Sequence, residues 1–453
     1  MIESTPKQAI SGTPSLADVV VVGAGLAGKA ASLQLARAGL KVVCISPAEE
    51  TRRSSVGESL DWSAPELFKT LGLPMHHLIE TEMATWKRHV TLRLRNGCSK
   101  HYVPTPWLGN PPLNIELRTL HVDRERLDRE LMKLALEQGV TLAHDKVITV
   151  QRTGKHIVSV GTASGAQYSA AWFIDASGNG ASLFGRQFNL KKIEYGPVKV
   201  AMWTYFPVTD PVQGTTLYMD PSPTEYLSWI WEIPVNPCTV GVGLITTGEL
   251  TKEKREQGRS VDAIYRDGLA KFPRFEPLLG AGPSSEMNVT SFRCRAFRGV
   301  AGPNWLICGE AASMVDPITS NGVTAALRHA AEASSLILKY RRVGRLPLRA
   351  RICYSSRILQ MAKFFNGGIE KMVYEPPVRN HIGLQKAGAV YTSPAWSMNV
   401  VYARLKPFGV LKTLLLNSVL GVFRLSAWLF YRFSLYKRKK DGPHPKGQCE
   451  VTA

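Results

Sequence analysis

The feature that most constrains the fold is a glycine-punctuated strand–helix–strand pattern at residues 17–46, ADVVVVGAGLAGKAASLQLARAGLKVVCIS. In such a unit Gly23 permits a tight turn, Gly25 lets the backbone approach a pyrophosphate, and Gly28 lets the helix pack closely on the strand. The diphosphate would lie at the helix N-terminus, where unpaired N–H groups favour an anion. The pattern therefore predicts a Rossmann-like dinucleotide-binding unit. Its second strand ends in Ser46 instead of the Asp or Glu that usually binds the ribose, so Ser46 offers the adenosine a single hydrogen bond.

Three later stretches determine which dinucleotide is bound. Residues 120–140 predict a helix that follows Asp123. Residues 172–188 predict a strand that enters a DxSG turn, and residues 304–334 predict a strand, a Gly-Glu pair, a proline loop and a further helix. Together with the glycine turn, and in this order, these motifs resemble the FAD-binding domain of the superfamily of aromatic hydroxylases, geranylgeranyl reductases and flavin-dependent halogenases. The resemblance covers about residues 17–335.

This resemblance implies that the chain binds FAD without a covalent bond. In the family a late carboxylate binds the ribityl hydroxyls of the flavin, and here Glu310 takes the place of the usual Asp. The helix after the proline loop points its N-terminus at the isoalloxazine. The cofactor-binding residues that the resemblance implies are Gly23, Gly25, Gly28, Ser46, Gly57, Arg124, Asp175, Gly178, Gly309, Glu310, Pro317, Asn321 and Gly322.

A tryptophan pair marks a part of the chain that would lie near the substrate. The run WIWEIP at residues 229–234 alternates as a strand does, with both indoles on one face, and its proline should end the strand because it removes a ladder donor. The run resembles the W-x-W-x-I-P motif of the flavin-dependent halogenases, carried here by Trp229, Trp231, Ile233 and Pro234. In those enzymes the motif lies beside the flavin and keeps the substrate from the ring. The alternative is that both indoles only pack in the core of a substrate-domain sheet.

A second halogenase resemblance lies upstream, at residues 56–94, where a V-G-E loop precedes an amphipathic helix, the sequence LGL and a strand. Counted without gaps from LGL, the catalytic lysine of those enzymes falls on Lys87. They use reduced flavin, oxygen and halide to form hypohalous acid, which the lysine captures and directs at the substrate. Lysine suits this role as a hydrogen-bond donor or, deprotonated in an apolar pocket, as an amine that forms a haloamine. The alternative is a surface lysine at a strand edge, beside Arg88.

The loop DPITSNG, which ends at Gly322, is the third element of this resemblance. In halogenases it offers backbone N–H groups to the halide, which here would be those of Asn321 and Gly322. Tryptophan halogenases also place a carboxylate beside the lysine, whereas this sequence has Thr319 at that position, followed by Ser320. Thr319 therefore weighs against free tryptophan as the substrate and leaves hydroxylation open. We take Lys87 and Ser320 as the candidate catalytic residues.

The predicted fold class is α/β, with a Rossmann-like FAD-binding domain of the glutathione-reductase type, an inserted antiparallel substrate sheet and a helical C-terminal region. Strand-like runs such as VKVAMWTYFPV, TTLYMD and CTVGVGLIT indicate the sheet, which the Gly/Pro-rich LLGAGPSS closes. The predicted boundaries are a flexible tail at 1–16, the FAD-binding domain at 17–195 and 286–340, the substrate-domain β-sheet at 196–285, and a basic helical region at 341–453.

Positive charge is concentrated near the C-terminus. Residues 339–440 contain 20 Lys/Arg and two acidic residues, so they carry +18 of the net charge of +20. Within them, residues 408–433 predict an amphipathic helix with Thr413, Asn417, Gly421 and Arg424 on one narrow stripe and a broad apolar face. Only 11 uncharged residues separate Lys412 from Arg424, fewer than the ~20 that span a bilayer. The helix is expected either to cover the substrate cavity or to lie among lipid headgroups.

We expect residues 339–440 to localise the enzyme, by binding an anionic membrane surface or an acidic carrier protein, and to take no part in its chemistry. Seven cysteines without CxxC or metal-ligand spacing indicate reduced thiols and no metal site, and the N-terminus lacks the apolar core of a signal peptide. The expected location is therefore the cytoplasm, at the inner face of the membrane if the tail binds lipid. No nucleic-acid partner is expected.

No second GxGxxG motif is present, so reduced flavin (FADH2) must come from a partner flavin reductase or from transient NAD(P)H binding. The leading interpretation is an FAD-dependent halogenase-like monooxygenase that acts on an electron-rich aromatic substrate, either small or carrier-tethered. The alternatives are an FAD-dependent hydroxylase of an aromatic, carried on a protein or peptide or free, a geranylgeranyl-reductase-like flavoenzyme, and a flavin-binding interaction module without catalysis.

Overall fold

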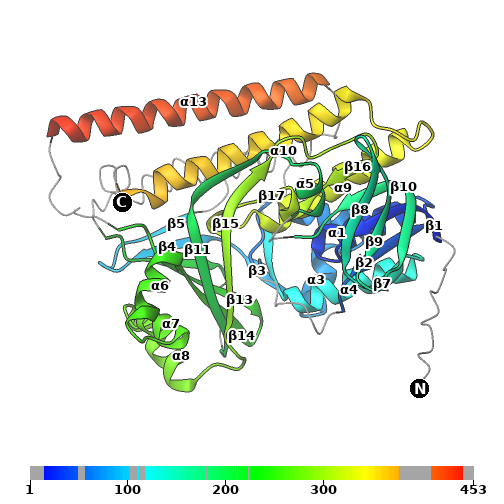
Figure 1. Ribbon diagram of the computed structural model, residues 1–453. Helices are drawn as coiled ribbons and strands as arrows, with labels where there is room; N and C mark the ends of the chain where they lie inside the picture. The colour runs from blue at the N-terminus through cyan, green and yellow to red at the C-terminus, as the bar shows by residue number, and fades with distance from the viewer. Residues whose placement is uncertain are drawn as a thin grey trace, which may run out of the picture.

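The computed structural model describes residues 15–48, 57–102, 110–111, 118–178, 182–209, 211, 213–222, 225–376 and 410–441. Two sheets lie side by side, and two long C-terminal helices run across one end of the molecule (Figure 1). The predicted α/β fold class, with a parallel nucleotide-binding sheet, a second sheet and a helical C-terminal region, is confirmed. The flexible tail predicted at 1–16 lies almost entirely outside the described residues.

The first sheet has seven strands in the order β7-β2-β1-β10-β9-β8, and β16 also pairs with β10. Strands β7, β2, β1, β10 and β16 are parallel, as crossover connections require, while β9 and β8 extend the sheet in antiparallel pairs. Its elements are β1 (Ser15–Val22), α1 (Leu26–Arg37), β2 (Val42–Ser46), α4 (Arg124–Glu137), β7 (Thr141–His144), β8 (Val147–Thr153), β9 (His156–Thr162), β10 (Gln167–Asp175), α5 (Leu183–Gln187), β16 (Trp305–Ile307) and α9 (Gly322–Tyr340).

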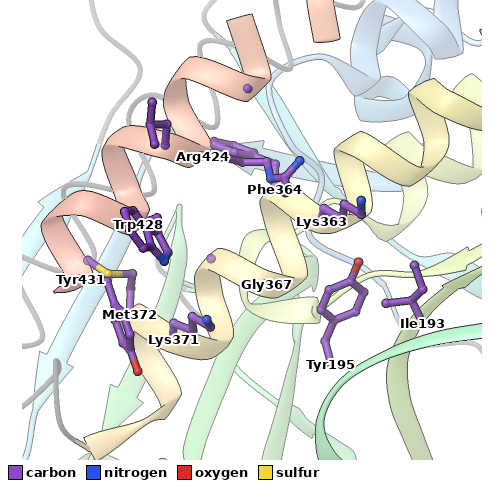
Figure 2. A pocket seen from close by; sticks show the side chains of 13 residues that line it. Ile193, Tyr195, Lys363, Phe364, Gly367, Lys371, Met372, Arg424, Trp428 and Tyr431 are labelled. Atoms are coloured by element: carbon purple, nitrogen blue, oxygen red, sulfur yellow. The ribbon is translucent and has the colours of Figure 1, made fainter. Parts of the chain in front are cut away.

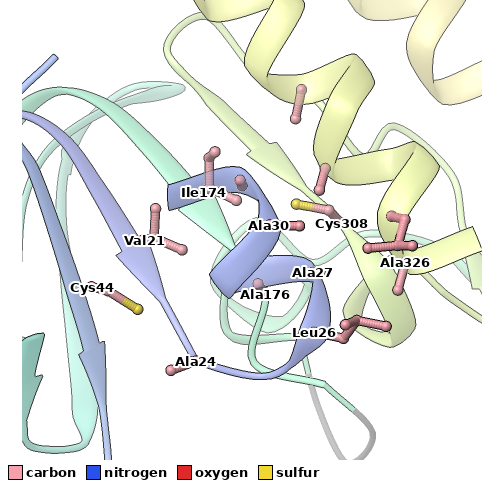
Figure 3. Packing of buried hydrophobic residues seen from close by; sticks show 14 of the residues in the cluster. Val21, Ala24, Leu26, Ala27, Ala30, Cys44, Ile174, Ala176, Cys308 and Ala326 are labelled. Carbon is pink, nitrogen blue, oxygen red and sulfur yellow. The ribbon is translucent and has the colours of Figure 1, made fainter. Parts of the chain in front are cut away.

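Small residues let α1 lie close to the sheet and to α9. Ala27 on α1, Ala176 after β10 and Ala326 on α9 belong to one buried cluster around the start of α1 (Figure 3). A Cβ at Gly28 would overlap the carbonyl oxygen of Gly23, so only glycine fits at this crossing. The predicted role of Gly28 in close helix–strand packing is confirmed.

The second sheet has eight strands in the order β17-β15-β11-β14-β13-β12-β4-β5, all antiparallel except for the pair β12–β4. It reaches beyond the predicted 196–285, because it takes strands from three separate parts of the chain instead of one insertion. Its elements are β4 (Val90–Leu94), β5 (Ser99–Tyr102), β11 (Lys192–Pro207), β12 (Thr215–Met219), β13 (Trp229–Asn236), β14 (Thr239–Thr247), α6 (Gly248–Glu256), α7 (Val261–Leu269), α8 (Glu276–Ala281), β15 (Asn288–Phe297) and β17 (Ser313–Met314).

A two-stranded sheet, β3 (Ala84–Lys87) and β6 (Thr119–Val122), contacts β13 of the second sheet and leads directly into α4 of the first unit. Helices α2 (Ala64–Thr70) and α3 (Met75–Glu80) precede it. This connection matters because β3 ends at the lysine that the sequence singles out.

Strand β13 presents different side chains to the two faces of the second sheet. Trp229, Trp231 and Ile233 belong to one buried cluster, and Ile230 belongs to another that includes residues of α7 and α8. Both indoles therefore lie on one face, as predicted. The strand does not end at Pro234 but continues to Asn236. The pairing with β14 shifts register just after Pro234, and proline is tolerated beside such an irregularity because no regular ladder hydrogen bond is lost there.

The C-terminal region consists of α10 (Leu348–Ile369), a π-helical turn η6 (Glu370–Tyr374) and α13 (Val410–Asp441). Helix α13 lies along α10 (Figure 1), and the contact is made by a small apolar cluster of Leu416 and Leu420 with Phe364 and Phe365 and by polar side chains. Arg357 Nη1 donates to Thr413 Oγ1 (3.2 Å), Asn417 Nδ2 to Ser356 Oγ (2.6 Å), and Arg424 Nη1 to Gln360 Oε1 (2.7 Å). The predicted polar stripe therefore faces the protein, and much of the apolar surface of α13 faces outward.

One helical stretch among the described residues, Thr413–Lys437, is long and apolar enough to cross a membrane, with a mean hydropathy of 1.5 over its most apolar window. Its polar contacts run along α10, so it lies across the molecule and does not project from it.

Candidate active site

The glycine turn after β1 forms a cradle for an anion. Gly23 has a φ of +98°, and a Cβ there would lie 2.5 Å from the carbonyl oxygen of Ala176. A Cβ at Gly25 would meet no atom within 4 Å, so open space faces the backbone at this position. Helix α1 begins at Leu26 with no side-chain cap and no acidic residue in its first turn. Its first N–H groups and the positive end of its dipole thus fit the diphosphate of FAD.

Asp175, predicted to bind the cofactor, holds its own loop. Both of its carboxylate oxygens are occupied by hydrogen bonds from the chain, and the residue is fully buried. Oδ1 accepts from Ser177 N (3.0 Å) and Ser177 Oγ (2.6 Å), and Oδ2 accepts from Ser182 Oγ (2.7 Å) and Phe184 N (2.8 Å). We infer that Asp175 positions the DxSG turn, while Gly178 in that turn, with a φ of +79° and open space beside it, leaves room for a ligand.

Glu310 lies close to two guanidinium groups. Burial raises its pKa, while the charges of Arg124 and Arg295 act to lower it. Arg124 also donates to the carbonyl oxygen of Gly57 (3.4 Å), which joins the loop before α2 to the start of α4. A carboxylate held in this way can accept hydrogen bonds from hydroxyl groups, as the ribityl chain of FAD requires. Ser46, at the end of β2, is buried.

Lys87 is not a surface residue, so the alternative of an exposed lysine at a strand edge is wrong. It is 1% exposed, and its Nζ lies 5.0 Å from the ring centroid of Trp62. Its Nζ donates hydrogen bonds to Ser59 Oγ (2.8 Å), Leu60 O (2.8 Å) and Ser320 Oγ (3.3 Å). All three acceptors are neutral. Burial lowers the pKa of Lys87 to about 7, against a smaller upward effect of the Asp61 charge.

The structure brings the two candidate catalytic residues together, although 233 residues separate them in sequence. Ser320 has a left-handed backbone (φ +57°) that turns the chain toward α9, and its Oγ donates to Ser59 Oγ (3.0 Å). The neighbouring Thr319 uses its hydroxyl inside the loop, where it donates to Asp316 O (3.1 Å) and accepts from Asn321 Nδ2 (3.1 Å). The lysine therefore has no carboxylate partner from this loop.

The predicted halide site lies at the beginning of α9. This helix begins at Gly322, directly after Asn321, with no side-chain cap hydrogen bond and no acidic residue in its first turn. Unpaired N–H groups at such an end attract an anion. The turn η5 (Pro317–Thr319), which contains the predicted Pro317, and the left-handed Ser320 direct the chain into the helix. The anion-binding role of Asn321 and Gly322 remains a prediction.

A hydrogen-bonded chain that the sequence did not predict continues from the lysine to a buried histidine. Ser59 Oγ lies 2.7 Å from Thr215 Oγ1, which lies 2.9 Å from Nε2 of His121. Burial, with the charges of Lys87 and His89 adding to it, lowers the pKa of His121 well below its usual value. The imidazole is therefore neutral near pH 7. Ser59 belongs to the V-G-E-S loop and His121 to residues 120–140, so both lie in recognised stretches, but the sequence assigned neither a role.

Glu58 is a second residue that the sequence analysis missed. It directly precedes Ser59, and burial raises its pKa to about 7 against the opposing effects of Tyr205 and Arg124. The Tyr205 hydroxyl donates to Oε1 (2.5 Å), and Oε2 is buried with no hydrogen-bond partner among the described residues. A carboxyl group that titrates near neutral pH thus lies one residue from the acceptor of the Lys87 ammonium.

A second buried lysine, Lys199, holds the other end of the loop. Its Nζ lies 2.6 Å from Asp316 Oδ2, 3.4 Å from Glu370 Oε2 and 3.7 Å from the ring centroid of Tyr374. The Tyr374 hydroxyl donates to Asp316 Oδ1 (3.0 Å), and Asn366 Oδ1 accepts from the Asp316 N–H (3.0 Å). Asn366 belongs to α10, and Glu370 and Tyr374 belong to η6. Part of residues 339–440, the region predicted to localise the enzyme and to take no part in its chemistry, therefore also holds the DPITSNG loop.

The tryptophan motif connects the two lysines. The ring centroids of Trp229 and Trp231 lie 5.9 Å apart at an angle of 54°. Trp229 Nε1 donates to the Tyr374 hydroxyl (2.8 Å), while Trp231 Nε1 is buried with no partner among the described residues. The carbonyl oxygen of Pro234 accepts from Thr85 Oγ1 (2.6 Å), on the strand that ends at the catalytic lysine candidate. The two indoles are core residues of the sheet and also contact both halves of the site.

Comparison with known proteins agrees with this geometry. The family model described as tryptophan halogenase matches residues 113–338, and the model described as FAD dependent oxidoreductase matches residues 18–185. A tryptophan 2-halogenase from Chondromyces crocatus is 26% identical over 80% of this chain and 70% of its own length. A 1H-pyrrole-2-carbonyl-[peptidyl-carrier protein] brominase from Pseudoalteromonas luteoviolacea is 26% identical over 71% of this chain and 77% of its own.

The fold is shared with solved structures of low sequence identity. The flavin-dependent brominase Bmp2 superposes with a TM-score of 0.66 at 20% identity, over 94% of this chain and 100% of that chain. The two family models together span most of both sheets, and the glycine turn has the shape that the dinucleotide needs. The chain is an FAD-dependent oxidoreductase and belongs to the flavin-dependent halogenase family.

Proposed function

We propose that this enzyme halogenates an electron-rich aromatic ring and that Lys87 delivers the halogen. The observation that carries the proposal is the environment of Lys87, whose Nζ is buried among neutral acceptors and joined to Ser320 of the DPITSNG loop. Bound FAD, once reduced, supplies with O2 and halide the hypohalous acid on which the chain acts. The α9 N-terminus, at Asn321 and Gly322, holds the halide near Lys87.

Lys87 can receive the halogen because part of it is an uncharged amine near neutral pH. The nitrogen lone pair attacks the halogen of hypohalous acid, so an N–X bond forms and the X–O bond breaks, and the departing hydroxide takes a proton from the amine and leaves as water. The aromatic ring then takes the halogen from nitrogen, and the ring proton returns to the amine. Ser59 and Ser320 hold Nζ in place by hydrogen bonds. The Trp229–Trp231 pair separates the substrate from the flavin.

The substrate that the relatives favour is an aromatic ring tethered to a carrier protein. Two relatives, a brominase and a chlorinase, act by name on 1H-pyrrole-2-carbonyl groups on a peptidyl-carrier protein. Thr319, in the place of a carboxylate, agrees with a substrate other than free tryptophan. The cations of residues 339–440 offer an acidic carrier protein a complementary surface.

We place the enzyme in the cytoplasm, with reduced flavin supplied by a partner reductase or by NAD(P)H, and with α13 at the inner face of the membrane. Its outward apolar residues and the basic run at its end favour that position. Hydroxylation is the second candidate function, and the absence of a carboxylate at Thr319 is the observation that favours it.

The test uses the FAD-loaded full-length chain with a flavin reductase, NADH and pyrrole-2-carbonyl or phenolic substrates, free and on a carrier protein. Product masses are compared with bromide, with chloride and without halide. Halogenated product that requires Lys87 supports the proposal. A product heavier by one oxygen in every halide condition establishes the hydroxylase instead, and turnover of free substrate alone contradicts the tethered substrate.

A further inference from the structure

A cavity of about 580 Å³ lies between α10, α13 and the beginning of β11 (Figure 2). It is distinct from the lysine site, with which it shares no residue. Its volume is that of an ordinary small-molecule site. The side chains that line it are of three kinds: cations (Lys363, Lys371, Arg424), aromatic rings (Tyr195, Phe364, Trp428, Tyr431) and small or aliphatic residues (Ile193, Gly367, Gly368, Met372, Gly421, Leu425).

Missing side chains create this cavity. Gly367 and Gly368 on α10 lie across it from Gly421 on α13. A Cβ at Gly421 would meet no atom within 4 Å, and a Cβ at Gly367 would touch the ring of Tyr195 at 3.5 Å. Glycine in a helix interior costs about 1 kcal/mol relative to alanine, so three such positions around one space carry a cost that the helices themselves do not require.

The lining is cationic and unneutralised. Lys363, Lys371 and Arg424 form no ion pair among the described residues, and no acidic residue lines the cavity. Arg424 donates to the neutral side chain of Gln360 (2.7 Å), and Lys371 lies 5.1 Å from the ring centroid of Tyr431. Burial lowers the pKa of Lys363, and the charges of Arg424 and Arg298 lower it further, so Lys363 is repelled by cations around it. An anion would relieve this repulsion.

One hydroxyl group also points into this space without a partner. The Tyr195 hydroxyl oxygen is buried and has no hydrogen-bond partner among the described residues. Figure 2 shows it directed toward α10 and Lys363. A buried donor that is left unpaired costs free energy, and a phosphate oxygen would satisfy it together with the cations.

The cavity continues onto the exposed apolar face of α13. Leu425 and Trp428 line it and are nonetheless 57% and 51% exposed. The outward apolar residues of α13 that share this exposure are Leu411, Leu414, Leu415, Val422, Leu425, Trp428, Leu429 and Phe433. A cationic recess that opens on an apolar surface matches a molecule with an anionic head and long apolar chains.

We propose that this cavity binds the phosphate headgroup of an anionic phospholipid, with its acyl chains along the outer face of α13. The lipid anchors α13 in the plane of the membrane. Because α13 packs on α10, the lipid also lies next to the segment that holds the DPITSNG loop. The proposal rests on the membrane position given under the proposed function, and the phosphate of a carrier's phosphopantetheine arm is the competing anion. The apolar surface beside the cations favours the lipid, because that arm has no acyl chain to cover it.

The experiment measures binding of the FAD-loaded full-length chain to vesicles of phosphatidylcholine alone and with phosphatidylglycerol. Gly421→Leu fills the cavity without changing charge and favours the helix. We expect it to lower the affinity for the anionic vesicles at least tenfold and to leave binding to neutral vesicles unchanged. Lys371→Gln with Arg424→Gln removes two cavity charges, and Lys437→Gln with Lys440→Gln removes two charges from the exposed end of α13.

General attraction of Lys and Arg to an anionic surface accounts for about fivefold in affinity for each cation, in both double variants alike. The proposal is overturned if the two double variants lose equal affinity for the anionic vesicles, or if Gly421→Leu binds these vesicles as tightly as the wild type. Displacement of the vesicles by soluble phosphopantetheine also overturns it and would assign the cavity to the carrier arm. Halogenation of the aromatic substrate that the wild type accepts, measured without vesicles, should be unchanged in Gly421→Leu, so a failure of lipid binding is distinguishable from a failure of the proposed activity.

Discussion

Two lysines, Lys87 and Lys199, are buried to the same degree near the two ends of one loop, yet their surroundings give them opposite protonation. Lys199 is paired with Asp316 and Glu370, and their charges raise its pKa above the usual value although burial alone would lower it. Among the residues that the structure describes, Lys87 has only hydroxyl and carbonyl acceptors, and burial lowers its pKa to about 7. Burial alone therefore does not determine what a lysine can do; the carboxylates beside it decide between a fixed cation and a reactive amine.

The difference also assigns the two lysines different tasks. Lys199 connects the beginning of the DPITSNG loop to η6 and stays charged through the physiological range. Lys87 meets the end of the same loop at Ser320 and exchanges a proton near neutral pH. One loop is thus held at its beginning by an ion pair and meets the proposed reactive group at its end.

The largest expected effect is on product formation in Lys87→Ala. Removing a positioned group of this kind costs about 10²- to 10⁴-fold in rate. Flavin oxidation should continue, because the amine acts only after the oxidant has formed. Halogenated product and NADH consumption measured in one coupled assay check both statements. Lys87→Arg keeps a charge but has no available lone pair, so it should fail as well; product at the wild-type rate in either variant refutes the role of Lys87.

Replacement of the other lysine should act on stability first. Lys199→Met leaves the carboxylates of Asp316 and Glu370 buried without their cation, which costs about 3–5 kcal/mol. Urea unfolding measures this loss. Lys252→Met, which removes an exposed lysine of α6, is the matched control and should change little. If Lys199→Met is as stable as the control, the charged cluster does not hold the loop.

The low pKa of Lys87 predicts a pH dependence of both rate and stability. The rate of halogenation should rise through about pH 7, as the amine appears. The folded-state pKa lies below the usual 10.5, so between about pH 7 and 10.5 the unfolded chain binds more protons and stability should rise with pH. In Lys87→Met product formation should be lost, and the rise of stability with pH over this range should be smaller than in the wild type; urea unfolding and product assays across this range measure both. A rate that falls above pH 7 means that the ammonium is the active form.

A carboxylate placed beside Lys87 should make it resemble Lys199. Ser320 has a left-handed backbone that Asp and Asn tolerate, so Ser320→Asp puts a negative charge near Nζ without new strain. An opposite charge at this distance raises the pKa by about 1–3 units, which should move the rising limb of the rate profile upward by that amount. Ser320→Asn is the uncharged control. Identical profiles for the two variants contradict the electrostatic difference between the lysines.

The sequence predicted best what depends on neighbouring residues. The glycine turn follows from the sterics of six consecutive positions, and its Gly23 and Gly28 have the geometry that the motif requires. Counting from LGL found Lys87, but neither its burial nor its link to His121 followed from the sequence. The partners of that chain lie 28 to 156 residues apart, and no local pattern records such contacts.

The C-terminal helix shows a different limit. Periodicity predicted both the helix and its polar stripe, at Thr413, Asn417 and Arg424, but hydropathy could not say which face meets the protein. The usual rule places apolar residues inward, and Leu416 and Leu420 follow it, but α10 also offers Ser356, Arg357 and Gln360 to the stripe. The partner surface decides the orientation, and that surface forms only when the two helices pack.

The smallest expected effect concerns the hydroxyl group of Tyr374, which connects the two lysine regions. Tyr374 donates to Asp316 Oδ1 and accepts from Trp229 Nε1, so Tyr374→Phe removes a contact between the loop and the tryptophan motif. A hydrogen bond to a charged acceptor contributes about 1.5–3 kcal/mol, and the loss in urea unfolding should fall in that range. In the same cluster Tyr226→Phe removes a hydroxyl that donates to Glu370 Oε2 (2.8 Å), away from the loop. Both variants should lose stability, but only Tyr374→Phe should raise the bromide concentration needed for half-maximal rate, because only it loosens the loop that leads to the halide site. An equal rise in both variants would mean that the cluster stabilises the fold without positioning the loop.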